Sequence, residues 1–179
     1  MRADGLYEQF RLVFERFYNP LCGYANSFVK EQSICEDIVQ EVFIRIWETR
    51  RDLLQSDSIR FYLFTAVRNN CLTHLSREQK RAIYSLSDLD PEDEDGIADA
   101  EPPAGEAVNY QALLGAGIEK LPPKCKEVFL LARMGELSNQ QVADTLGISV
   151  KTVNNQLWKA LKLLKAFARS VNSWLLFFL

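Results

Sequence analysis

Apolar residues recur at helical spacing along much of the chain, most clearly from Leu137 to Lys165. There the sequence L-S-N-Q-Q-V-A-D-T-L-G-I-S-V-K-T-V-N-N-Q-L-W-K-A-L-K-L-L-K predicts two short helices around a tight turn. Ser138 can cap the first helix with Gln141 reaching back from three residues later, and Gly147 supplies the backbone freedom that ends it. Ser149 can cap the second helix. This is the pattern of a helix-turn-helix.

The second of these helices has an apolar face and a polar face. We expect its core face to carry Val153, Leu157, Ala160, Leu161, Leu164 and Ala168. The opposite face carries Lys151, Asn155, Trp158, Lys159, Lys162, Lys165 and Arg169, with Asn154 and Gln156 towards its two edges. Amide side chains can bind adenine edges and lysines can neutralise phosphates, so Asn154, Asn155 and Gln156 are candidate base readers. The alternative is the solvated face of an ordinary helix pair. We expect Trp158 to pack against a neighbouring helix, because tryptophan is usually mostly buried.

A second amphipathic helix is predicted from Glu36 to Arg50. Its core face carries Ile38, Val39, Val42, Phe43, Ile46 and Trp47. Its other face carries Asp37, Gln40, Glu41, Ile44 and Glu48, an acidic stripe with an exposed isoleucine at its centre. A solvated face and an interface for a basic helical partner are equally consistent with this stripe.

The next predicted helix, residues 58 to 81, has an unusually mixed outer face. Its core face carries Phe61, Phe64, Val67, Cys71, Leu72 and Leu75. Its outer face carries Tyr62, Thr65, Asn69, Asn70, Thr73, Ser76, Arg77 and Lys80. Aromatic, amide and basic groups together can stack on unpaired bases and hold a strand's phosphates. The preceding loop, T-R-R-D-L-L-Q-S-D-S-I-R, can wall a pocket for an extruded base or be an ordinary connection. Arg68 falls on the apolar side, where we expect it to be a buried ion-pair partner.

Charge divides the 179 residues into three parts. Residues 1–81, 82–106 and 107–179 carry net charges of +1, −9 and +5. The acidic part also contains prolines and glycines without helical periodicity, which predicts a flexible linker. The expected fold class is therefore all-α, with a helical bundle at residues 1–84, an acidic linker at 85–106 and a helix-turn-helix domain at 107–179. The linker is either a simple tether or a competitor of phosphate that suppresses DNA binding by the free protein.

Catalytic and metal chemistry find no support in the sequence. The four cysteines have no C-x-x-C pair and His74 is the only histidine, so we expect no zinc site, no cofactor and reduced thiols in a cytoplasm. No phosphate-binding glycine loop and no nucleophile-base pair is recognisable, which predicts a protein that is not an enzyme. We expect no secretory leader, and the terminal W-L-L-F-F-L is too short to span a bilayer. This tail either packs on the last domain or docks a partner.

Four motifs in order resemble those of one family. They are D-I-V-Q-E-V-F-I-R-I-W, F-Y-L-F-T-A-V-R-N-N-C-L, L-P-P-K-C-K-E-V-F-L-L and L-S-N-Q-Q-V-A-D-T-L-G-I-S-V-K-T-V-N-N-Q-L. Over roughly residues 6–170 the chain resembles an extracytoplasmic-function sigma factor of bacterial RNA polymerase, and its apolar tail is similar to tails in some members of the Bacteroidetes type.

The resemblance implies three interfaces. Asp37, Gln40 and Glu41, with Ile44 and Glu48 on the same stripe, would bind the clamp helices of core RNA polymerase. The face of Tyr62, Thr65, Asn69, Asn70, Thr73, Arg77 and Lys80 would bind the melted minus-ten element of promoter DNA. The groove-facing positions for the duplex minus-thirty-five element are Lys151, Thr152, Asn154, Asn155, Gln156 and Lys159. An anti-sigma factor, membrane-bound in the Bacteroidetes group, is the further partner implied.

The chain departs from the family at two places. Asn154 and Gln156 stand where many members have arginine or lysine, so the promoter sequence cannot be inherited. Tyr62 and Phe64 stand where a tryptophan-containing motif is common. Two other functions are compatible with parts of the pattern: a stand-alone regulator that binds duplex operators as a dimer, and a helical adaptor that binds only proteins. The strand-stacking face is useless to either.

Overall fold

The computed structural model describes residues 2–86 and 110–177, and all regular secondary structure in these ranges is helical. The N-terminal half, residues 2–86, contains α1 (Arg2–Ala25), α2 (Gln32–Thr49), the 3-10 helix η1 (Arg51–Gln55) and α3 (Ile59–Leu86). The C-terminal half, residues 110–177, contains α4 (Tyr110–Glu119), α5 (Pro123–Arg133), α6 (Asn139–Leu146) and α7 (Val150–Phe177). The expected all-α class is confirmed. Residues 87–106 of the predicted linker and the side chains of the apolar tail lie outside the described part.

The core of the N-terminal half is rich in aromatic side chains. The Phe43 ring of α2 lies 4.9 Å from that of Phe14 and 6.0 Å from that of Phe10, both on α1. Tyr24 of α1 lies 5.3 Å from Phe64 of α3, and both are fully buried. Aromatic pairs at these distances add to the free energy of burying their area. Three helices are thereby held around one core.

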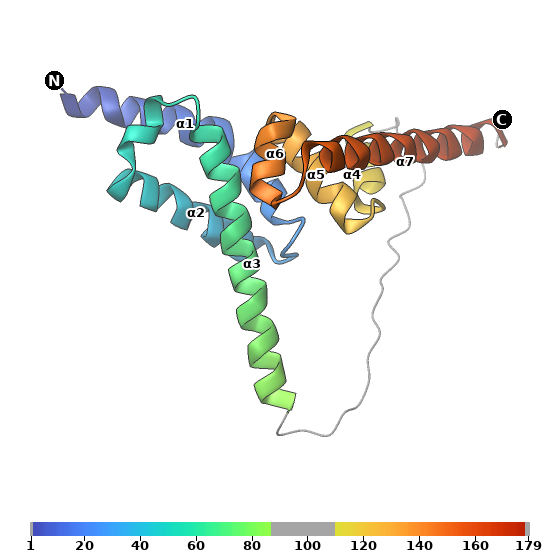
Figure 1. The fold of residues 1–179 in the computed structure, drawn as a ribbon, viewed down its shortest axis with the longest axis horizontal. Helices are drawn as coiled ribbons and strands as arrows, with labels where there is room; N and C mark the ends of the chain where they lie inside the picture. Colours follow the sequence, from blue (N-terminus) through green and yellow to red (C-terminus); the bar gives the residue numbers. More distant parts are fainter. Residues whose placement is uncertain (1, 87–109, 178–179) are drawn as a thin grey trace.

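The expected core faces are largely confirmed. On α2, Ile38, Val39, Val42, Phe43 and Ile46 are buried, while Trp47 is half-buried. On α3, Phe64, Val67 and Cys71 are buried, but Leu72 is 40% exposed, contrary to expectation. In Figure 1 the C-terminal part of α3 projects beyond the helices against which the rest of α3 packs.

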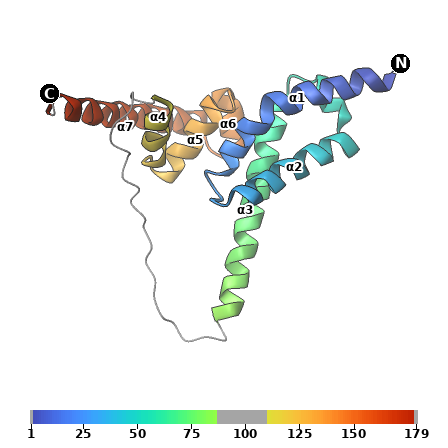
Figure 2. The ribbon, with the colours of Figure 1, turned by 180° about the vertical axis from the view of Figure 1, so that it is seen from behind.

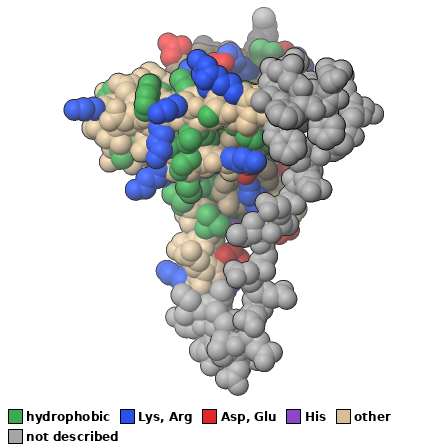
Figure 3. Space-filling view, turned by 90° about the vertical axis from the view of Figure 1, so that its right-hand side faces the viewer, with side chains coloured by type: hydrophobic (Ala, Val, Ile, Leu, Met, Phe, Trp, Pro, Cys, Tyr) green, Lys and Arg blue, Asp and Glu red, His purple; other side chains and the backbone are tan. Residues whose placement is uncertain are grey.

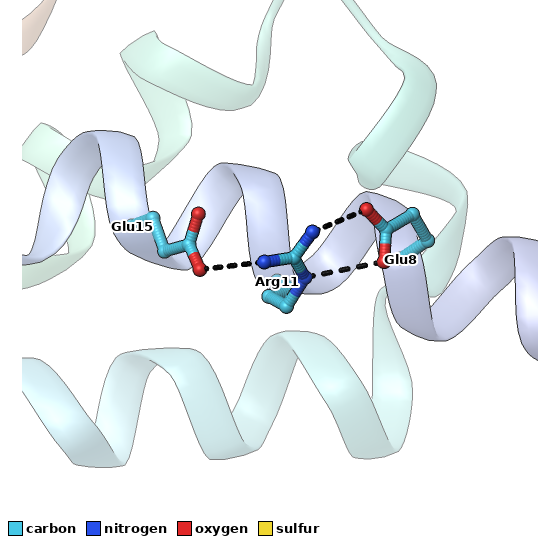
Figure 4. A network of polar contacts seen from close by, with 3 residues as sticks. All are labelled: Glu8, Arg11 and Glu15. Carbon is cyan, nitrogen blue, oxygen red and sulfur yellow. Dashed lines mark hydrogen bonds and ion pairs between the residues drawn. The ribbon is translucent and has the colours of Figure 1, made fainter.

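The solvent side of α1 carries a short row of alternating charges. Arg11 donates hydrogen bonds to Glu8 and Glu15, one turn away on either side (Figure 4). The hydrogen bond from Arg11 lowers the pKa of Glu8. All three side chains are about half exposed, so this row contributes little to stability and serves mainly as a polar surface.

The helix-turn-helix is formed as the sequence predicts. Ser138 Oγ accepts a hydrogen bond from Gln141 N, and Gln141 Oε1 accepts one from Ser138 N, so the predicted capping box is confirmed. Gly147 has φ 63°, a left-handed conformation that ends α6 at low cost only for glycine. Ser149 Oγ accepts from Thr152 N at the start of α7. Each helix boundary is therefore set by a local signal.

The two halves share one hydrophobic core. Val128, Leu131 and Val142 of the C-terminal half belong to the same buried cluster as Tyr24 and Phe64. In both Figure 1 and Figure 2, α6 lies between α3 and α7. The turn after α5 comes so close to α3 that a Cβ added at Gly135 would lie 3.3 Å from Phe64 Cδ1 and 2.5 Å from Leu131 O. The halves are thus packed against each other.

Polar contacts bridge the same interface. The Arg68 guanidinium of α3 lies 2.7 Å from Glu127 of α5, with side chains only 19% and 22% exposed. Lys30 lies 3.1 Å from Glu119, and Arg60 pairs with Glu136. The expectation that Arg68 is an ion-pair partner is confirmed, and the carboxylate it binds comes from the other half. A pair this sheltered from solvent is held more firmly than the exposed pairs of α1.

The thiols are consistent with a structural role. All four cysteines are free, and burial raises the pKa of Cys71 to about 12, which keeps this thiol protonated. Within the described residues, no group of three His, Cys, Asp or Glu side chains is placed to hold a metal ion. No helix in the described ranges combines the length and the apolar character needed to cross a bilayer.

Arg68→Ala should lower the free energy of unfolding by about 1–3 kcal/mol, because it leaves the half-buried Glu127 carboxylate without its charged partner. Urea denaturation measures this change. Arg81→Ala is the matched control on the same helix, since the pair of Arg81 with Glu78 is exposed and should contribute less than about 0.5 kcal/mol. Equal effects of the two substitutions would contradict the packing of the two halves in solution.

Candidate nucleic-acid interface

The acidic stripe of α2 is exposed as expected. Asp37, Gln40, Glu41, Ile44 and Glu48 all face solvent, and Ile44 is 55% exposed. Periodicity along α2 could not show that α1 completes this surface. Ile44 lies at the edge of an apolar groove of about 430 Å³, which is lined by Tyr7, Phe10, Phe14, Gln40, Phe43, Ile44, Trp47 and Glu48. An apolar groove with acidic groups at its rim suits a helix that carries both an apolar and a basic side chain.

The outer face of α3 lines a second pocket, of about 450 Å³. Tyr62, Thr65, Asn69 and Asn70 contribute to it from α3, and Arg50, Leu53 and Ser58 from the preceding segment. The sequence left open whether this segment is a pocket wall or an ordinary loop, and the structure places it at the pocket. The Arg50 guanidinium lies 5.4 Å from the centroid of the Tyr62 ring. An aromatic ring and a guanidinium plane on one wall can stack with a planar base.

Asn70 has an unusual position in this pocket. Its Nδ2 is buried and has no hydrogen-bond partner among the described residues. A buried amide donor without a partner costs roughly 1–3 kcal/mol. Because this nitrogen is enclosed by its neighbours, an acceptor in the pocket can reach it only after the Asn70 side chain turns.

The other residues predicted to bind single-stranded DNA on α3 differ in their exposure to solvent. Asn69, Thr73, Arg77 and Lys80 are exposed, and Thr73 donates its hydroxyl to Asn69 O of its own helix. Thr65 is half-buried, because its Oγ1 lies 3.3 Å from Oγ1 of Thr145 on α6. The C-terminal half therefore touches one flank of the predicted strand-binding face.

The polar face of α7 divides into free and engaged side chains. Lys151, Asn154, Asn155 and Lys159 are exposed, whereas Thr152 is half-buried and hydrogen-bonded to Ser149 Oγ. Gln156 is also half-buried, and its Oε1 accepts a hydrogen bond of 2.8 Å from the Cys125 thiol of α5. Gln156 thus fastens α7 to α5, a contact that helical periodicity alone cannot indicate.

Trp158 does not pack where the sequence predicted. It is 65% exposed rather than packed against a helix, and the Lys162 ammonium lies 5.1 Å from its ring centroid. Leu161, expected in the core, is also 46% exposed, although the neighbouring Ala160 is fully buried. The position of Trp158 among lysines on the polar face was the signal for exposure, and general burial statistics overrode it. In Figure 3, blue Lys and Arg side chains lie around green apolar ones. Such a mixture suits a nucleic acid, which has charged phosphates and apolar base surfaces.

The two halves match two protein-family models. Residues 13–81 match the model described as sigma-70 region 2, and residues 111–164 match the model described as sigma-70, region 4. The first range includes the pocket on α3 and all of the groove except Tyr7 and Phe10. The second covers the helix-turn-helix.

Individual relatives agree with these matches. The chain is 26% identical to the ECF RNA polymerase sigma factor SigG of Mycobacterium tuberculosis, over 88% of this chain and 48% of SigG. It is also 26% identical to the RNA polymerase sigma factor CnrH of Cupriavidus metallidurans, over 88% of this chain and 85% of CnrH. The chain thus spans about half the length of SigG and most of CnrH.

A solved structure shares the fold. The sigma factor RpoE of Bartonella quintana, crystallised with the anti-sigma factor NepR, aligns with a TM-score of 0.63 and 18% identity, over 89% of this chain and 96% of RpoE. This likeness concerns the fold alone. With two sigma-70 regions matched in order and relatives of one group, the chain belongs to the extracytoplasmic-function sigma factors.

Proposed function

We propose that this chain is a transcription initiation factor that binds core RNA polymerase, recognises promoter DNA and stabilises the melted strand. The observation that carries the proposal is the pocket on α3, where the Arg50 guanidinium lies 5.4 Å from the centroid of the Tyr62 ring. A duplex-binding regulator or a protein adaptor has no use for such a stacking site beside a helix-turn-helix. The chain acts by binding, with no catalytic step of its own.

Each half of the chain has its own binding functions in this proposal. Residues 1–84 bind the polymerase through the α2 stripe and the α1–α2 groove, and bind the melted minus-ten strand through the α3 face. Residues 107–179 bind the minus-thirty-five duplex through the exposed side chains of α7, chiefly Lys151, Asn154, Asn155 and Lys159. The acidic segment 85–106 joins them. Tethering on one enzyme lets two weak DNA contacts act together, since each raises the effective concentration of the other.

An inhibitor is the other proposed partner. RpoE, which shares the fold, was crystallised with an anti-sigma factor. The exposed apolar groove beside Ile44 offers such a protein a surface that also serves polymerase binding, so the inhibitor and the enzyme would compete there. The setting of this competition is the bacterial cytoplasm.

The packed halves must separate for both promoter elements to be read. Elements about 25 base pairs apart on duplex DNA are separated by roughly 85 Å, at about 3.4 Å per base pair. In the packed form α6 touches α3, with Thr145 Oγ1 only 3.3 Å from Thr65 Oγ1. We therefore propose that the packed form is the resting state, and that polymerase binding favours the separated one.

Run-off transcription with purified, sigma-free polymerase tests the proposed function. Adding the chain should give transcripts from specific promoters, and no transcripts without it. A stand-alone regulator would give none under these conditions, although it would bind duplex DNA. An adaptor would give no transcripts and would not bind DNA.

Tyr62→Ala should weaken binding of the polymerase complex to a single-stranded minus-ten oligonucleotide by about 5- to 150-fold, because stacking contributes about 1–3 kcal/mol per base. Fluorescence anisotropy with a labelled oligonucleotide measures the affinity. Tyr62→Phe keeps the ring and should bind nearly as tightly as the unchanged chain. If Tyr62→Ala binds as well as Tyr62→Phe, the pocket does not stack a base.

A disulfide between Thr65→Cys and Thr145→Cys should lock the packed form and abolish promoter-specific transcription, since the two side chains are already in contact, with their hydroxyl oxygens 3.3 Å apart. Reduction should restore the transcription shown by the single variants. The two single variants are the matched control, because neither can form the bridge, and oxidation should leave their transcription unchanged. Full activity of the oxidised double variant would contradict the proposal that the packed halves must separate.

A further inference from the structure

One hydrogen bond joins the two helices of the helix-turn-helix on their exposed side. Asn139, the first residue of α6, donates from Nδ2 to Oδ1 of Asn154 on α7, over 2.7 Å. Both side chains are exposed. The remaining polar side chains at the start of α6 are turned elsewhere, since Gln140 donates to Asp144 and Gln141 closes the capping box. Asn139 is therefore the side chain of this turn that is directed at α7.

The backbone on both sides of this bond is held in place. The capping box fixes the start of α6, and the hydrogen bond from Thr152 N to Ser149 Oγ fixes the start of α7. Val153, next to Asn154, is fully buried, and so is Val142 of α6. A side-chain bond between two such anchored positions restricts the rotation of the Asn154 carboxamide rather than the position of a helix.

This restriction matters because a carboxamide has two different ends. With Oδ1 engaged by Asn139, the Nδ2 donor of Asn154 is free, and it has no partner among the described side chains. A free donor selects bases with acceptors in the major groove, which are guanine N7 and O6, adenine N7 and thymine O4. Cytosine, whose N4 group is a donor there, is disfavoured.

We propose that Asn139 is a positioning residue that sets the orientation of the Asn154 carboxamide, and thereby the base that α7 selects at one position of the minus-thirty-five element. This inference rests on the proposed role of α7 in reading duplex DNA. Asn139 itself does not touch the base. It converts a side chain that can rotate to suit either a donor or an acceptor into one that presents a donor.

The substitution Asn139→Asp reverses the bond. A carboxylate only accepts, so the Asn154 amide must turn its Nδ2 towards α6 and expose Oδ1. An exposed acceptor selects cytosine N4 or adenine N6. A carboxylate in the first turn of α6 is also favourable for the helix, so the fold should be retained.

The experiment selects sequences from a promoter library with a randomised minus-thirty-five element, using the polymerase complex of each variant. Asn154→Ala first identifies the position, as the one where base preference is lost. At that position Asn139→Asp should raise the ratio of cytosine to guanine about fivefold or more, because a base contact of this kind contributes about 1–3 kcal/mol. The double variant Asn139→Asp with Asn154→Ala should show the same loss of base preference at this position as Asn154→Ala alone.

Controls distinguish an effect on the orientation of the Asn154 carboxamide from an effect of the added charge and from a general loss of DNA binding. Gln140→Glu adds the same charge one residue away, and should lower affinity for all sequences without changing any base preference. The inference is overturned if Asn154→Ala changes no position, or if Asn139→Asp leaves the ratio unchanged. If the unchanged complex retains no sequence from the library at all, it is the proposed function that fails.

Discussion

The packing of the C-terminal half against α3 is the constraint on which the other features depend. Phe64 is buried between Tyr24 of its own half and the turn at Gly135 of the other. Around this apolar contact, Arg68 and Glu127 form an ion pair sheltered from solvent. One helix thus presents its inner face to two sets of helices and its outer face to solvent. The proposed strand-binding pocket is on this outer face.

The same packing sets the free energy that is needed to separate the two halves. The proposed reading of two distant promoter elements requires separation, which divides the shared hydrophobic cluster and leaves Arg68 and Glu127 without each other. Polymerase can drive this change only through contacts that are stronger in the separated form. Binding of polymerase to the α1–α2 groove favours the separated form only if the shape of the groove changes when the C-terminal half separates from α3. Contacts between polymerase and the C-terminal half contribute directly, because they compete with α3.

Local signals made part of this arrangement predictable. The Ser138 capping box and Gly147 act within a few residues, and both were readable from the sequence. The exposed Ile44 followed from a period of 3.6 residues. Periodicity cannot specify which residues contact a given helix face. Arg68 was predicted to form an ion pair, but nothing in the sequence identified Glu127 as its partner. The exposure of Leu72 was also missed, and that of Trp158 was missed because general burial statistics were preferred to its position among lysines. The base-reading set could likewise be proposed only as exposed amides and lysines, whereas the bonds to Cys125 and Asn139 depend on tertiary structure.

These bonds suggest a division between affinity and selectivity on α7. Lysine ammonium groups contact phosphates on any sequence, and Lys151, Lys159 and Lys162 are exposed for this purpose. Selectivity requires a polar group whose direction is fixed before DNA arrives, because a freely rotating amide adapts to several bases and also loses rotational entropy on binding. Of the two edge amides, Gln156 is fixed towards the core and Asn154 towards solvent. On the proposed function, a chain with amides in place of arginine or lysine in this helix would gain selectivity from the network that orients them, and a change at Asn139 would alter recognition without altering any residue that contacts DNA.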